Sequence, residues 1–165
     1  MRSRSLRADQ IALGVGLGAL ALLLGALGFQ YIGGLAPCEM CHWQRWPHIA
    51  AAIIGIAGVP LLSSRASGSA ARDRARMLAW IAVGLVAVSG LIGLYQSGMQ
   101  WGIVPGPSSC SGQRFVMGSN VVPEIQCDVV SWSLFGLSMA SYNMIFSFLI
   151  AGLGSLALLK DKNAA

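Results

Sequence analysis

Four apolar runs without a charged side chain constrain this sequence more than any other feature. Three of them, Ile11–Phe29, Met77–Leu94 and Tyr142–Leu159, are close to the roughly 20 residues that a helix needs to cross a bilayer. The composition agrees, because 55% of the residues are hydrophobic and only 10% are charged, whereas a soluble domain carries about 25% charged residues. These values argue against a soluble enzyme, a disordered tail and a nucleic-acid-binding arm.

The fourth run, His48–Leu62, is only fifteen residues long. At about 1.5 Å per residue, it is too short for a hydrocarbon core of roughly 30 Å. A helix that spans the membrane here must therefore begin near Cys41, which brings His42 through Arg45 into its first turns at the membrane surface. Pro47 then lies inside the helix, and we expect it to kink the helix or to mark an irregular first turn.

Together these runs predict an all-α fold: an integral membrane four-helix bundle, formed by a single domain over residues 1–165, with two outer loops that carry cysteine pairs. The expected spans are residues 10–30, 42–62, 77–95 and 139–159, and the expected outer loops are residues 31–41 and 96–138. Asp9 is expected to cap the first helix. The first apolar run, Ile11–Phe29, lacks a convincing small-residue cleavage site, so we expect a retained helix rather than a signal peptide. Gly14 and Gly18 have GxxxG spacing, which favours close packing inside the bundle.

The basic residues predict how the bundle is oriented. Nine of the eleven Lys and Arg residues flank the runs on one side, namely Arg2, Arg4, Arg7, Arg65, Arg72, Arg74, Arg76, Lys160 and Lys162, whereas Arg45 and Arg114 lie on the other. Because cytoplasmic loops are enriched in Lys and Arg, both termini are expected in the cytoplasm. The net charge of +5 is thus a sign of topology, and no nucleic-acid partner is expected.

All four cysteines fall on the opposite, outer side. Cys38 and Cys41 form a C-x-x-C motif in the first outer loop, and Cys110 and Cys127 lie in the second. Four cysteines allow three pairings, of which Cys38–Cys41 with Cys110–Cys127 is the simplest, because C-x-x-C readily closes on itself.

Three functions compete for these cysteines. They are structural disulfides, a zinc site, and thiol–disulfide exchange. Sixteen residues separate Cys110 from Cys127, which disfavours a metal site because zinc sites usually have a second close pair. A C-x-x-C ring closes almost no loop, so as a structural staple it would stabilise little.

Arg45 favours the exchange of disulfides. It follows Cys41 by four residues and therefore shares its helix face. A guanidinium and a helix N-terminus both stabilise a thiolate, and an arginine at the edge of the bilayer is costly without a role. Snorkelling to the lipid headgroups is the alternative for Arg45. For His42 and His48, proton relay and plain packing both remain open.

The run Pro37-Cys38-Glu39-Met40-Cys41-His42-Trp43-Gln44-Arg45 resembles the P-C-x-x-C-x-x-x-R motif of the disulfide bond formation protein B (DsbB) family. Phe29-Gln30 upstream, and Cys127 followed by Trp132-Ser133-Leu134-Phe135-Gly136, resemble the same family. The resemblance extends over essentially the whole chain. It implies a bacterial inner-membrane protein whose cysteine loops are periplasmic, and which reoxidises a DsbA-type thiol oxidase of thioredoxin fold at the expense of membrane quinone.

The resemblance also implies a role for each site residue. Cys110 matches the cysteine that the partner attacks, and Cys127 matches its disulfide mate. Cys38 and Cys41 match the pair that passes electrons to ubiquinone or menaquinone. Cys41 and Arg45 match the residues beside the quinone, with His42 as a further candidate for the same site.

Two departures from the family leave questions open. Many members have a histidine just after the third span, where this sequence has Ser97, so His42 or His48 is a candidate to replace it. The segment between Cys110 and Cys127 is also short for the family, which leaves the shape of the docking loop open. Two other classes remain: an enzyme similar to vitamin K epoxide reductase, although there the quinone-side C-x-x-C lies in a late helix, and a non-enzymatic protein with structural disulfides.

Overall fold

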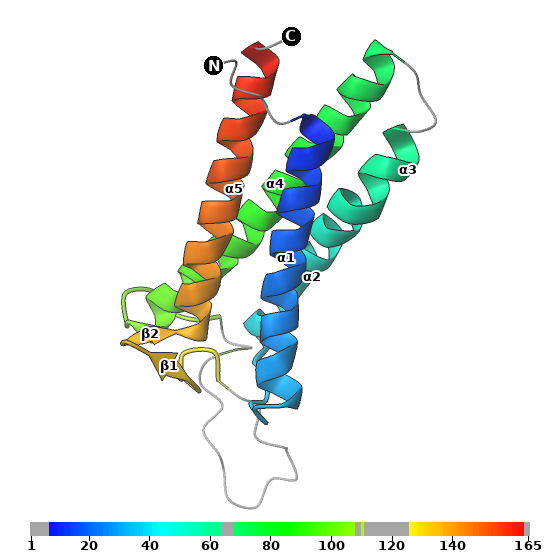
Figure 1. Cartoon of the computed structure of the whole chain (residues 1–165). Helices are drawn as coiled ribbons and strands as arrows, with labels where there is room; N and C mark the ends of the chain where they lie inside the picture. The colour runs from blue at the N-terminus through cyan, green and yellow to red at the C-terminus, as the bar shows by residue number, and fades with distance from the viewer. Residues whose placement is uncertain (1–6, 64–67, 108–109, 111–125, 164–165) are drawn as a thin grey trace, which may run out of the picture.

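The computed structural model describes residues 7–63, 68–107, 110 and 126–163 (Figure 1). Four helical segments pack side by side along most of their length. They are α1 (Ala8–Tyr31), the continuous run of α2 (Glu39–Ile53), the π-helical turn η1 (Ile54–Gly58) and α3 (Val59–Ser63), then α4 (Ser69–Gln100) and α5 (Met139–Asn163). Among the described residues, α1, α4 and α5 are long and apolar enough to cross a membrane. The expected all-α four-helix fold with two cysteine pairs is confirmed.

The second helical segment begins where its short apolar run requires. Cys38 is the residue before α2, and its Sγ accepts a hydrogen bond from the Cys41 backbone N–H at 3.2 Å. Helix α2 therefore carries Cys41 and Arg45 in its first turns, as predicted. The α-helix continues through Pro47, and the irregular turn lies further along, at η1. Pro60 lies two residues beyond the end of η1 and has no N–H to donate, which favours a local change of hydrogen-bond register there.

Helix α4 is longer than expected at both ends. Its first turns, Ser69–Arg76, contain three Ala and three Arg residues, which are good helix formers even outside an apolar span. At the other end it continues to Gln100, so Gln96 and Ser97 lie inside the helix rather than in the second outer loop. Both side chains are buried. This extension brings polar groups of α4 into the interior of the bundle beside the cysteines.

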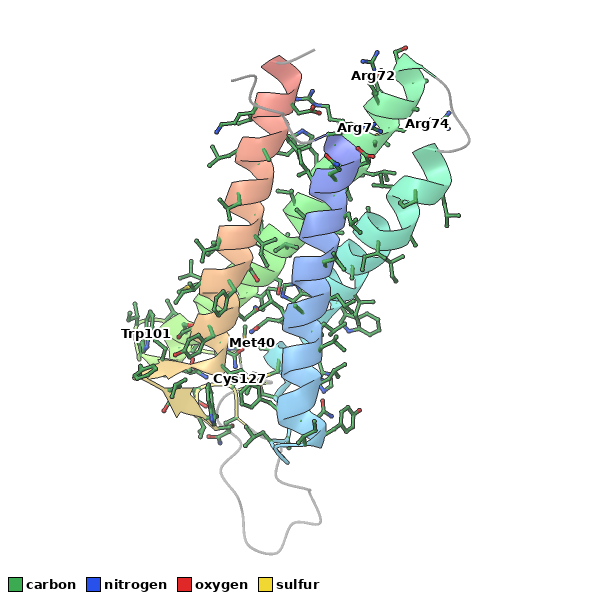
Figure 2. The ribbon with its side chains drawn as sticks, in the orientation of Figure 1. Arg7, Met40, Arg72, Arg74, Trp101 and Cys127 are labelled. Carbon is green, nitrogen blue, oxygen red and sulfur yellow. A yellow bond between two sulfur atoms is a disulfide. The ribbon has the colours of Figure 1, made fainter. Side chains whose placement is uncertain are left out.

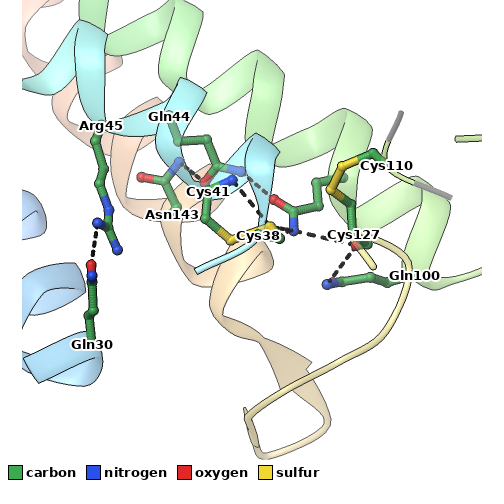
Figure 3. The surroundings of a disulfide bond; sticks show 10 residues. Gln30, Cys38, Cys41, Gln44, Arg45, Gln100, Cys110, Cys127 and Asn143 are labelled. Atoms are coloured by element: carbon green, nitrogen blue, oxygen red, sulfur yellow. Dashed lines mark hydrogen bonds between the residues drawn. A yellow bond between two sulfur atoms is a disulfide. The ribbon is translucent and has the colours of Figure 1, made fainter. Parts of the chain in front are cut away.

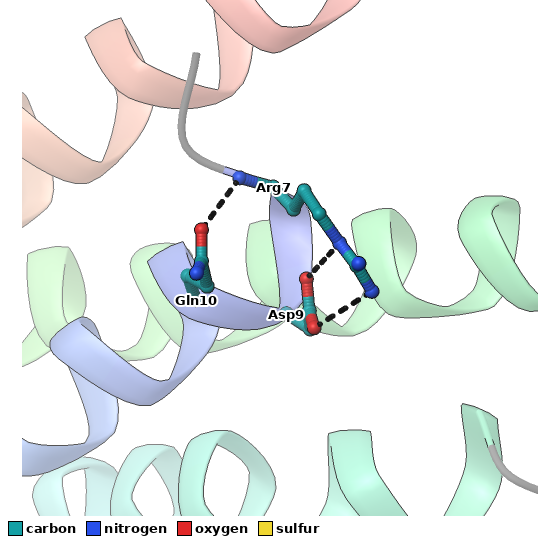
Figure 4. Close-up of polar contacts among 3 residues, drawn as sticks. All are labelled: Arg7, Asp9 and Gln10. Carbon is teal, nitrogen blue, oxygen red and sulfur yellow. Dashed lines mark hydrogen bonds and ion pairs between the residues drawn. The ribbon is translucent and has the colours of Figure 1, made fainter. Parts of the chain in front are cut away.

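The first turn of α1 differs in detail from the prediction. Arg7, not Asp9, occupies the N-cap position. Its backbone N–H donates to Gln10 Oε1 at 3.2 Å, and its guanidinium donates to both carboxylate oxygens of Asp9, also at 3.2 Å (Figure 4). Asp9 thus places a negative charge in the first turn, where it interacts favourably with the positive end of the helix dipole.

A short hairpin, β1 (Ser133–Leu134) and β2 (Leu137–Ser138), precedes α5 and was not predicted. Its two-residue turn has positive φ at Phe135 (50°) and Gly136 (78°), the geometry that matches the twist of a hairpin. The Tyr142 hydroxyl donates to the Leu134 carbonyl at 3.0 Å and ties the hairpin to α5.

Small residues let the helices approach closely in one half of the bundle. A Cβ on Gly55 of η1 would lie 2.8 Å from Gly16 Cα of α1 and even closer to the Ala12 carbonyl oxygen. Gly18 faces Ile150 of α5, which confirms close packing inside the bundle at that position. Gly14 faces nothing within 4 Å, so the expectation was wrong there. The tightest approach of α1 therefore depends on Gly16 and Gly55.

The two ends of the bundle differ in chemistry. The start of α1 and the end of α5 lie at one end, and the hairpin and Cys127 lie at the other (Figures 1 and 2). Arg7, Arg72 and Arg74 are at the end of the termini (Figure 2). The residues Arg2, Arg4, Arg65 and Arg114, which also entered the topology prediction, fall outside the described residues, as does most of the docking segment, residues 111–125.

Candidate site of thiol–disulfide exchange

Two disulfides lie next to each other (Figure 3), at the end of the bundle where Figure 2 labels Cys127. Cys38 pairs with Cys41 and Cys110 pairs with Cys127, with Cα–Cα distances of 5.1 and 5.3 Å, within the normal range for disulfides. Both pairs belong to one buried cluster that also contains Met40 and Met99. Residues from α2, the end of α4 and the segment before the hairpin thus enclose all four sulfur atoms.

Three of the four cysteines are almost fully shielded from solvent, whereas Cys41 is partly buried. Cys38 and Cys110 are 5% exposed and Cys127 is 0% exposed. The Cys127 backbone N–H donates to the Cys110 carbonyl at 2.9 Å, so a backbone hydrogen bond joins these two cysteines in addition to their disulfide.

Gln96 of α4 contacts the Cys38–Cys41 disulfide and the backbone of Cys127. Its Nε2 lies 3.2 Å from Cys38 Sγ, 3.8 Å from Cys41 Sγ and 3.4 Å from the Cys127 carbonyl oxygen. Gln100, one turn further along α4, donates to the same carbonyl at 3.5 Å (Figure 3). The amide group of Gln96 is therefore positioned between the two pairs of cysteines.

A chain of side-chain amides leads from Gln96 into the bundle. Gln44 Nε2 donates to Gln96 Oε1 at 2.5 Å, and Asn143 Nδ2 donates to Gln44 Oε1 at 2.9 Å (Figure 3). Two backbone carbonyls fix the direction of these bonds, because Cys127 O and Ser89 O accept only and face the nitrogen atoms of Gln96 and Asn143. Each amide therefore has a defined orientation.

The chain ends at His48 of α2, which is 3% exposed. Its Nε2 lies 2.8 Å from Asn143 Oδ1. Because that oxygen can only accept, Nε2 carries the proton. Ser89 Oγ, 3.0 Å from the same nitrogen, donates to the Gln44 carbonyl at 2.9 Å. Helices α2, α4 and α5 are thus joined by one buried polar network.

A cavity of about 350 Å³ lies beside the Cys38–Cys41 pair. One part of its wall is aromatic: Phe29 and Trp132 have ring centroids 4.8 Å apart, and Tyr142 follows at 6.1 Å from Trp132. Another part is polar and includes Cys41 and Arg45. The cavity can accept a flat, apolar molecule that carries a few polar atoms.

Arg45 lines this cavity and turns toward α1, where its guanidinium donates to Gln30 Oε1 (Figure 3). Its Nε is buried and has no hydrogen-bond partner among the described residues. His42, the further quinone candidate, is exposed and does not line the cavity, whereas His48 does. The structure therefore brings Cys41 and Arg45 to one cavity and leaves His42 outside it.

The sequence analysis missed Gln44, Gln96 and Asn143 as site residues. A usable signal was present, since strongly polar side chains inside apolar spans generally face the bundle interior and mark functional sites. Gln44 and His48 are four residues apart on α2, which also predicts that they share a helix face.

Comparison with known proteins identifies the family. The model of the family described as "Disulfide bond formation protein DsbB" matches residues 8–157. The chain belongs to the DsbB family. A disulfide bond formation protein B of Verminephrobacter eiseniae is 33% identical over 88% of this chain and 82% of its own length. One of Aromatoleum aromaticum is 30% identical over 82% and 85%. No solved structure matches.

Membership of the DsbB family places the two disulfides in a functional context. The chain is a multi-pass membrane protein that takes part in disulfide bond formation as a disulfide oxidoreductase. The four cysteines and the buried amides around them are accordingly the first residues to consider for the transfer of electrons between thiols.

Proposed function

We propose that this protein reoxidises a periplasmic DsbA-type thiol oxidase and passes the electrons through Cys110–Cys127 and then Cys38–Cys41 to a membrane quinone. The observation that carries the proposal is the arrangement of the two disulfides. They share one buried cluster, and the Cys38–Cys41 pair also borders the cavity. This arrangement supports a relay with an outer pair, an inner pair and a cavity for the final acceptor.

The residues around the cavity suit a quinone. Its volume is adequate for a ring with two carbonyl groups, and the rings of Phe29, Trp132 and Tyr142 supply an aromatic surface. Arg45 offers a buried Nε–H without a partner among the described residues. A bound quinone supplies an acceptor for two electrons and two protons. Cys41 and Arg45 would hold it next to the inner pair.

The chemistry of the chain itself is a series of thiolate attacks on sulfur. The partner's thiolate attacks Cys110, forms a mixed disulfide and releases Cys127 as a thiolate. The partner's second thiolate attacks the partner's own sulfur in the mixed disulfide and releases oxidised partner and the Cys110 thiolate. Exchange with the inner pair then re-forms Cys110–Cys127 and leaves Cys38 and Cys41 reduced. The rate of each step depends on how well the attacking and departing thiolates are stabilised. Arg45 and the N-terminus of α2 contribute positive potential near Cys41.

Cysteine variants of the purified protein test this order of events. With a reduced DsbA-type partner and a water-soluble quinone analogue, the wild type should lower the quinone absorbance. Cys110→Ser should abolish partner oxidation, while its reduced Cys38–Cys41 pair still reacts with the quinone. Cys127→Ser should accumulate a mixed disulfide between Cys110 and oxidised partner.

Two results would contradict the proposal. Partner oxidation at the normal rate by Cys110→Ser would remove Cys110 from the entry position. A mixed disulfide that forms at Cys127 in the Cys110→Ser protein, and not at Cys110 in the Cys127→Ser protein, would reverse the assignment of the two cysteines.

A further inference from the structure

We propose that Gln96 is a catalytic residue for the exchange between the two disulfides, because its side-chain amide donates hydrogen bonds to the sulfur atoms on which negative charge develops. This inference rests on the proposed function, since it concerns an internal step of the same relay. It assigns a role to a residue outside every cysteine motif.

The position of Gln96 is the first support. Its Nε2 is within hydrogen-bonding distance of Cys38 Sγ and Cys41 Sγ and of the Cys127 carbonyl, at 3.2, 3.8 and 3.4 Å. The side chain is 3% exposed. A donor held in a buried site, where water cannot screen it, stabilises developing charge more strongly than the same donor in water.

The orientation of the amide is the second support. Gln96 Oε1 accepts from Gln44 Nε2, and Gln44 Oε1 in turn accepts from Asn143 Nδ2. Both N–H groups of Gln96 therefore face the sulfur atoms and the Cys127 carbonyl rather than the bundle. The donors are in place before the reaction, which saves the free energy of turning them toward the charge as it forms.

The step can be written so that its electrons balance. The Cys127 thiolate attacks Cys38 Sγ, a Cys127–Cys38 bond forms, the Cys38–Cys41 bond breaks, and its electron pair leaves with Cys41 as a thiolate. The Cys110 thiolate then attacks Cys127, re-forms Cys110–Cys127 and releases Cys38 as a thiolate. The two thiolates of the inner pair hold the two electrons that the outer pair has lost. Gln96 Nε2 reaches both Cys38 and Cys41, so it can stabilise each thiolate as it departs.

A two-phase oxidation isolates this step. Fully reduced protein, with four thiols, is mixed with an excess of a water-soluble quinone analogue. The first equivalent of quinone oxidises Cys38 and Cys41 directly, and the second is consumed only as Cys110 and Cys127 exchange with the inner disulfide. Acid quenching and alkylation with a mass tag identify which cysteines remain reduced at each time, independently of the quinone absorbance.

Gln96→Met keeps the size of the side chain but removes its donor. We expect the second phase to slow roughly tenfold or more, as for the loss of a hydrogen bond to a charged group, and by a clearly larger factor than the first phase, in which no cysteine thiolate departs from a protein disulfide. Free Cys110 and Cys127 should accumulate together with an intact Cys38–Cys41 disulfide. Gln96→Glu, which retains the acceptor for Gln44 but not the amide donor, should slow the second phase at least as much.

Gln100→Leu is the matched control, because Gln100 also donates to the Cys127 carbonyl from α4 but has no contact with sulfur among the contacts described. Its second phase should stay within about twofold of the wild-type rate. Equal slowing in Gln100→Leu would show that holding the loop, not stabilising sulfur, accounts for the effect. An unchanged second phase in both Gln96 variants, or equal slowing of both phases, would also overturn the proposal. A wild-type protein that reduces no quinone would instead refute the proposed function.

Discussion

Arg45 combines a place on the cavity wall with a buried Nε that has no partner among the described residues. Arg45→Met should lower kcat/KM for the quinone analogue about tenfold, because a charged donor to the quinone oxygen is lost. Arg45→Lys should restore only part of the activity, since lysine keeps the charge but not the planar fork. Quinone-reduction kinetics provide the measurement. Exchange between the partner and Cys110 serves as the control and should change little; unchanged quinone kinetics in Arg45→Met would leave Arg45 as a headgroup anchor.

His48 allows a prediction about stability. His48→Leu removes the shorter of the two hydrogen bonds to Asn143 Oδ1, the one of 2.8 Å, and leaves only the bond of 3.3 Å from Ser147 Oγ. We expect a loss of about 1 kcal/mol in the free energy of unfolding, within the range measured for interhelical hydrogen bonds in membranes. His42→Leu is the matched control, because His42 is exposed on the same helix. Unfolding in mixed detergent micelles measures both, and equal losses would contradict a structural role for the network.

At the scale of residues, the sequence identified groups that carry a motif and missed those that do not. The cysteine pairs and Arg45 have diagnostic spacing, and the structure places them at one end of the bundle. Gln96 has no such spacing. Whether its amide meets sulfur depends on the rotation of α4 and on how far that helix continues beyond the apolar run, and neither follows from local sequence.

The crossing of α1 and η1 at Gly16 and Gly55 leads to a prediction for the elements. In Gly55→Ala the new methyl group would overlap backbone atoms of Ala12 and Gly16, which cannot move independently of their helix. The two segments must separate, at a cost of about 1–3 kcal/mol, typical of overpacking. Gly58→Ala lies in the same π-helical turn, and its methyl group would meet nothing closer than 3.7 Å. Thermal unfolding in detergent should therefore separate the two variants, and equal melting temperatures would argue against a tight crossing.

The elements themselves were only partly predictable. The thickness of the hydrocarbon core determines where α2 must begin if its segment is to span the membrane. This limit predicts a start near Cys41, and the helix begins at Glu39. The π-helical turn and the hairpin gave no comparable signal. In the hairpin turn, Phe135 occupies a positive-φ position that usually holds Asn, Asp or Gly. The sequence therefore lacks the residue pair from which a two-residue hairpin turn is normally predicted.

For the whole molecule, the separation of charge and cysteines predicts the orientation in the membrane. The termini and the basic residues Arg7, Arg72 and Arg74 share one end (Figure 2), and cytoplasmic segments are enriched in such residues. Reporter fusions at residue 70 and at the C-terminus should both be active only in the cytoplasm. Fusions after residue 36 should report the periplasm. A fusion at residue 70 that reports the periplasm would contradict the orientation and, with it, the proposed relay.

The burial of the cysteines also limits the access of small thiols to the disulfides. Cys38 and Cys110 are only 5% exposed and Cys127 is fully covered, so small thiols collide with these three sulfur atoms less often than with an exposed disulfide. The partly buried Cys41 is the most accessible of the four. Slow reduction by a reagent such as glutathione thus measures access and not the reduction potential. An inert staple and a working relay will look alike in such an assay. Only equilibration in redox buffers, approached from both the oxidised and the reduced side, will distinguish them.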